Sequence, residues 1–64
     1  MKKKEKNVSE YITEALLELL TEKNLNEISI SELTDKANVS RVSFYRNFNS
    51  KNEIIEKYLY TNVI

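Results

Sequence analysis

Residues 29–51 of this 64-residue chain, SISELTDKANVSRVSFYRNFNSK, carry the pattern that decides its fold. Ser29 and Glu32 have the three-residue spacing of a capping box, which predicts that a helix begins at the residue after the serine. Asn38 marks the expected end of that helix, because asparagine tolerates the left-handed conformation that is common at C-caps. The spacing therefore predicts a helix over 30–37 that is followed by a tight turn.

A second short helix is expected directly after this turn. Ser40 is a candidate N-cap, and Phe44 and Phe48 lie four residues apart, so they share one helical face that we expect to be buried. The other side and the flanks of this predicted helix over 41–48 are mostly polar, with Arg41, Val42, Ser43, Tyr45, Arg46 and Asn47. Two helices joined by a short turn, the second of them polar, form a helix-turn-helix pattern.

The polar face suits DNA better than a protein core. In the major groove arginine can bind O6 and N7 of guanine, asparagine can bind N6 and N7 of adenine, and valine can contact a thymine methyl group. We expect base contacts from Arg41, Val42, Ser43, Arg46 and Asn47. We expect phosphate contacts from Ser29, Ser31, Tyr45 and Lys51. The two serines equally fit capping and surface roles, and Tyr45 equally fits a half-buried aromatic residue.

Lys51 occupies an unusual place for a cation. Ser50 and Glu53 have the spacing of another N-terminal cap, which predicts a helix over 51–61 with Lys51 in its first turn. The helix dipole disfavours a cation there, but a DNA phosphate shared between Lys51 and the helix N-terminus would explain it. The alternative is an exposed lysine at a slightly unfavourable position.

Residues 39–55, VSRVSFYRNFNSKNEII, resemble the signature of the Tet repressor (TetR/AcrR) family. That signature has Phe/Leu-Tyr-x-x-Phe in the recognition helix, here FYRNF at 44–48. It continues with Ser-Lys-x-x-Leu/Ile at the start of the next helix, here SKNEI at 50–54. The resemblance covers roughly residues 8–60. In this family the motifs belong to the DNA-binding domain.

The resemblance implies an all-α, homeodomain-like three-helix bundle with a helix-turn-helix and the start of a fourth helix. It also implies a recognition helix over 40–48 in the major groove of a palindromic DNA operator, in a cytoplasmic regulator that acts as a repressor. Two corner glycines of the family are replaced by Asn24 and Asn38. The family's C-terminal ligand-binding and dimerisation domain is absent from this chain, so we expect a homodimer for the full-length protein, a monomer for this fragment, and an effector of unknown identity.

Composition favours helices and disfavours an enzyme. Sixty-four residues allow one domain near the lower size limit for independent folding. The chain has no Gly, Pro, Cys or His, which leaves no disulfide, thiol or imidazole chemistry and few ligands for zinc. We therefore expect no catalytic residue, no cofactor, no metal site and no membrane segment.

The net charge is zero, but its distribution is uneven. Residues 1–6 form a basic arm with a net charge of +3, residues 7–35 carry −6, and residues 36–64 carry +3. Positive charge thus flanks the candidate DNA-reading helix, as electrostatic steering requires. The arm fits contact with DNA and a frayed, solubilising terminus equally well.

The predicted domain spans 7–64. Asn7 and Glu10 form a capping box for a first helix over about 8–23, whose apolar stripe marks it as a core helix. The last predicted helix carries apolar residues on more than one face, which indicates either an excised domain or a partner.

A second function remains open: a small helical module whose face of Arg41, Arg46 and Asn47 binds protein. DNA binding through cations weakens steeply with salt, whereas an apolar protein contact hardly changes.

Overall fold

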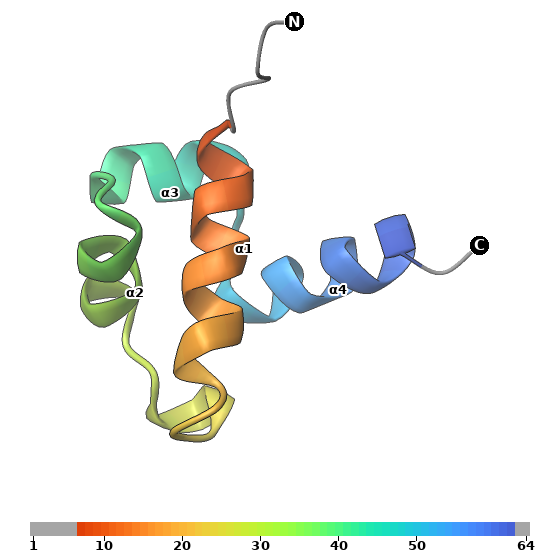
Figure 1. Ribbon diagram of the computed structural model, residues 1–64. Helices are drawn as coiled ribbons and strands as arrows, with labels where there is room; N and C mark the ends of the chain where they lie inside the picture. The colour runs from red at the N-terminus through yellow and green to blue at the C-terminus, as the bar shows by residue number, and fades with distance from the viewer. Residues whose placement is uncertain (1–6, 63–64) are drawn as a thin grey trace, which may run out of the picture.

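The computed structural model describes residues 7–62, and within this range all regular structure is helical. In chain order the elements are α1 (Val8–Leu19), the 3-10 turn η1 (Leu25–Glu27), α2 (Ile30–Ala37), α3 (Arg41–Asn47) and α4 (Lys51–Asn62), as Figure 1 shows. The expected all-α class is confirmed. The basic arm at 1–6 and the apolar residues 63–64 lie outside the described residues.

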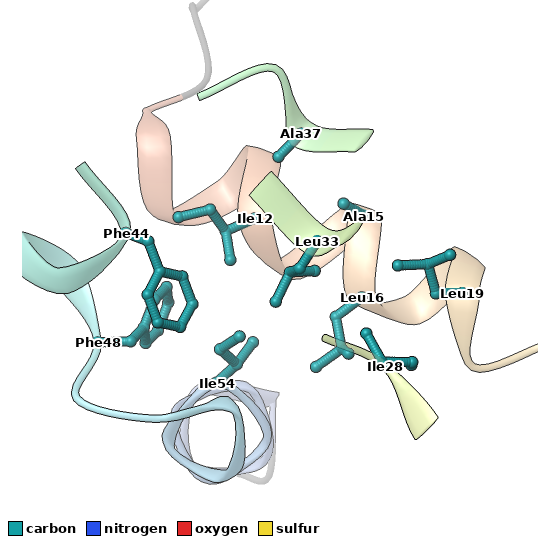
Figure 2. Packing of buried hydrophobic residues seen from close by; sticks show 10 residues of the cluster. All are labelled: Ile12, Ala15, Leu16, Leu19, Ile28, Leu33, Ala37, Phe44, Phe48 and Ile54. Atoms are coloured by element: carbon teal, nitrogen blue, oxygen red, sulfur yellow. The ribbon is translucent and has the colours of Figure 1, made fainter. Parts of the chain in front are cut away.

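The helix α1 is central, because α2, α3 and α4 each pack against it. In Figure 1, α2 runs beside α1, α3 crosses near the start of α1, and α4 extends away to one side. The buried apolar side chains are Ile12, Ala15, Leu16, Leu19, Ile28, Leu33, Ala37, Phe44, Phe48 and Ile54. Figure 2 shows them converging from all four helices and from the segment before α2. Full burial of a large apolar side chain contributes about 1.5–3 kcal/mol, so this cluster holds the bundle together.

The helix α1 ends at Leu19, four residues before the expected end near residue 23. After Leu19 the N–H of Thr21 bonds the carbonyl of Glu18, a three-residue spacing in place of the four-residue helical one. The Thr21 hydroxyl donates to the same carbonyl at 2.6 Å. A side chain that binds a helical carbonyl in this way competes with the backbone ladder. The helix α1 therefore ends before the apolar pattern in the sequence ends.

Two predicted capping boxes have different outcomes. At α1, Asn7 accepts the N–H of Glu10 at 2.9 Å and the Glu10 carboxylate accepts the N–H of Asn7 at 3.0 Å, as expected. At α2, Ser29 accepts the N–H of Glu32 at 3.0 Å, but the Glu32 carboxylate binds Lys23 at 2.8 Å instead of returning to the cap. This hydrogen bond lowers the pKa of Glu32 and raises the pKa of Lys23. The box at Ser29 is half formed because a cation competes for its carboxylate.

The two corner asparagines also differ. Asn38 has φ 61° and ψ 46°, the expected left-handed conformation, and the next N–H, from Val39, bonds back to the carbonyl of Thr34 at 3.0 Å. This is the Schellman arrangement that ends a helix. Asn24 has φ −79° and ψ 158°, which is an extended and not a left-handed conformation. Asn24 instead precedes η1, and its N–H donates to the Glu27 carboxylate at 3.1 Å.

Candidate nucleic-acid interface

The helix α3 separates a buried aromatic face from a solvent-exposed polar face. Ser40 caps it by accepting the N–H of Ser43 at 3.0 Å. Phe44 is fully buried and Phe48 is 3% exposed, with ring centroids 5.9 Å apart (Figure 2). The helix ends at Asn47, one residue earlier than predicted, because Phe48 has an extended backbone while its ring stays in the core. The position of the polar face is therefore set by the two phenylalanines.

The residues predicted to contact bases all lie on α3 outside its buried aromatic face. Val42 is 63% exposed, which is costly for an apolar side chain in solvent and compatible with a partner there. The remaining members divide into the exposed Arg41 and Arg46 and the half-buried Ser43 and Asn47. This surface contains two cations and no acidic residue, so it favours an anionic partner.

Arg41 is held by the preceding helix. Its guanidinium donates to the hydroxyl oxygen of Ser31 in α2, across the turn. Because Ser31 acts as the acceptor, its own hydroxyl proton can still be donated to another group. The structure thus places a predicted base-contact residue beside a predicted phosphate-contact residue.

Asn47 is engaged within its own helix. Its side-chain amide donates one of its two N–H groups to the carbonyl of Ser43 at 2.8 Å, so the second N–H and the amide oxygen are the atoms available to read an adenine. The backbone carbonyl of Asn47 accepts a hydrogen bond from Lys57 in α4 at 3.0 Å, and the Lys57 ammonium lies 5.1 Å from the centre of the Phe48 ring. The sequence did not indicate that Lys57 contacts α3, because this contact depends on how α4 packs.

Tyr45 and Ser29 remain at the surface. Tyr45 is 52% exposed and packs its ring edge-on against Phe44, with centroids 4.9 Å apart, so it supports the core while part of it faces solvent. Ser29 is exposed and caps α2 through its oxygen, which leaves its hydroxyl proton free to be donated. Both positions are compatible with phosphate contact.

Lys51 has partners that the sequence did not indicate. Its ammonium donates to the carbonyl of Leu25 at 2.9 Å and to the carbonyl of Ile28 at 2.6 Å, and the side chain is half-buried. Two of its three N–H groups are therefore used inside the protein. These carbonyls explain why a cation is tolerated in the first turn of α4 without any DNA present. No sequence signal connects positions 23 and 26 residues apart in this way.

A metal-holding cluster and a membrane-spanning helix are both missing from the part of the chain between residues 7 and 62. No group of three or more acidic, cysteine or histidine side chains is placed to hold a metal there. None of the described helices has the length and apolar character needed to cross a membrane.

Comparison with known proteins agrees with the helix-turn-helix geometry. Residues 12–58 match the family described as "Bacterial regulatory proteins, tetR family". The chain is also 41% identical over 46 residues to the "Uncharacterized HTH-type transcriptional regulator YvdT" of Bacillus subtilis (strain 168), across 72% of this chain and 24% of the relative. The chain therefore spans about a quarter of the length of that curated relative. No solved structure matches it. With the matched region covering α3 and most of the core, this chain belongs to the tetR family of bacterial regulatory proteins and carries that family's helix-turn-helix DNA-binding domain.

Proposed function

We propose that this chain binds DNA sequence-specifically, with α3 as the recognition helix in the major groove. The observation that carries the proposal is the split of α3 into a buried face of Phe44 and Phe48 and an exposed face with two arginines and no acid. A helix that is anchored on one side and offers forked donors on the other has the geometry of direct base readout.

The contacts divide into two kinds. Base contacts come from the surface of α3, namely Arg41, Val42, Ser43, Arg46 and Asn47. Phosphate contacts come from three hydroxyl groups at the edges of this surface, those of Ser29, Ser31 and Tyr45. Lys51 can add a phosphate contact only through the one N–H that the two carbonyls leave unused. Phosphate contacts orient the domain, whereas base contacts give the sequence preference.

Family membership supports a proposal about the biological setting. We propose a cytoplasmic transcriptional repressor that acts as a homodimer in its full-length form, because two-fold symmetric regulators bind palindromic operators with half-sites about 34–36 Å apart. The 64-residue chain corresponds to one half-site.

The test compares Arg41→Ala with Lys36→Ala, a control that removes a cation from α2 where it pairs with Glu18 at 3.2 Å. The probe is a duplex enriched from a random 20-base-pair library by the wild-type chain, together with its single-base variants. Arg41→Ala should weaken binding to the enriched duplex by about 1–3 kcal/mol and remove discrimination at one base pair. Lys36→Ala should keep the base preference.

Two results would count against this assignment. If Arg41→Ala weakens all duplexes equally, Arg41 binds the backbone and the readout belongs to the other residues of α3. If the wild-type chain enriches no duplex, and its binding to a protein partner is insensitive to salt, the surface of α3 is a protein-binding surface.

A further inference from the structure

Lys51 forms a bridge between the start of α4 and the segment that leads into α2. Its ammonium binds the carbonyls of Leu25, which lies in η1, and of Ile28, which directly precedes the cap of α2. The partners lie 26 and 23 residues away along the chain, so the bridge exists only in the folded protein. The half-buried position of Lys51 reduces competition from water for both bonds.

The bridge acts on the segment that leads directly into the cap of α2. Ile28 is fully buried in the core, and its carbonyl accepts the hydrogen bond from the Lys51 ammonium at 2.6 Å. Ile28 is followed at once by Ser29, whose oxygen caps α2 and whose carbonyl accepts the N–H of Leu33 at 3.0 Å. The Ile28 peptide thus sets the position of the α2 N-terminus.

We infer that Lys51 is a positioning residue for the start of α2, and that it supports DNA binding by placing the hydroxyls of Ser29 and Ser31. This inference rests on the proposed function. It differs from the expected phosphate contact, because the ammonium charge is directed at two protein carbonyls. A phosphate that drew Lys51 away would leave the Ile28 carbonyl buried beside an apolar side chain and without its donor, which is unfavourable.

The first measurement needs no DNA. Lys51→Met keeps the length and apolar stem of the side chain but removes its donors. Amide hydrogen exchange of Glu32 and Leu33, the two amides that bond to Ser29, should become at least about tenfold faster relative to that of core amides of α1. Lys36→Met, which removes an exposed cation of α2 that is paired with Glu18, should leave these two amides unchanged.

The second measurement uses the enriched duplex and separates positioning from charge. If Lys51 acts by positioning, Lys51→Met weakens binding while the slope of log affinity against log salt stays within about 0.3 of the wild-type slope. If Lys51 neutralises a phosphate, the slope falls by about 0.9. Affinities are corrected for the folded fraction, so a general loss of stability does not imitate either result.

A double-mutant cycle with Ser31→Ala completes the design. Positioning predicts non-additivity, because Lys51→Met has already displaced the hydroxyl that Ser31→Ala removes. The cycle with Lys36→Met should be additive. If Lys51→Met does not fold, the salt slope is measured on Lys51→Gln, which removes the charge but keeps an N–H₂ donor. The Lys51→Gln variant should also leave the salt slope unchanged.

The inference is overturned by unchanged exchange at Glu32 and Leu33, by a salt slope that falls by about one unit, or by additivity with Ser31→Ala. If the wild-type chain enriches no duplex, the proposed function fails together with the DNA-binding part of the inference. Amide exchange then still decides whether Lys51 holds the start of α2.

Discussion

Replacement of Asn38 tests the turn that sets α2 against α3. Asn38 has φ 61°, the one positive φ among residues 7–62, and its side chain is exposed. Changing it to alanine therefore removes no buried contact and acts mainly through the backbone. An ordinary residue pays about 1–2 kcal/mol in this conformation, whereas asparagine is one of the few that adopt it readily.

We expect Asn38→Ala to lower the free energy of unfolding by about 1 kcal/mol, a large part of the stability that so small a domain can have. For this chain length the melting temperature should fall by about 4–8 °C. Asn38→Gly should be tolerated, because glycine adopts positive φ at no steric cost, although the unfolded chain gains entropy. Urea unfolding followed by circular dichroism measures both variants.

Asn52 provides the matched control. It is exposed in α4, so Asn52→Ala should be neutral or stabilising by up to about 0.7 kcal/mol, because alanine is the better helix former. Replacing asparagine by alanine should thus lower the free energy of unfolding at Asn38 but not at Asn52. If Asn38→Ala leaves stability unchanged or raises it, the left-handed turn does not limit stability and the reasoning is refuted.

Three further outcomes follow from the fold. Phe48→Ala should cost about 3–5 kcal/mol and unfold most of the population, and a melting curve like that of the wild type would remove Phe48 from the core. Because the pKa of Glu32 is lowered in the folded state, its contribution to stability is present above the ordinary pKa of 4.5 and is lost as pH falls through the folded pKa, so Glu32→Gln should flatten the acid side of the stability profile. An unchanged acid side would show that the pair with Lys23 contributes nothing measurable. The 64-residue chain should sediment as a monomer at micromolar concentration, and a tight dimer would point to the exposed Leu59 and Tyr60 of α4 as its interface.

Local signals in the sequence determined the helices and the faces of α3. Serine and asparagine caps act within three or four residues, so Asn7, Ser29 and Ser40 could be identified without knowledge of the fold. The four-residue spacing of Phe44 and Phe48 likewise fixed which side of α3 is buried, and hence which residues are left for a partner. The left-handed turn at Asn38 was predictable because it depends on the conformational preference of one residue.

Only the tertiary structure decided the partners of the long charged side chains. Glu32 has the spacing to complete the cap at Ser29, yet it binds Lys23 because folding brings a cation within reach. Nothing in the sequence indicated that the ammonium of Lys51, for which a phosphate contact is predicted, binds carbonyls more than twenty residues away. Lysine and glutamate have several rotatable bonds and can reach many partners, so their choice depends on what the packed helices bring close. Caps and apolar spacing are encoded locally, whereas these contacts exist only once α1, α2 and α4 have come together.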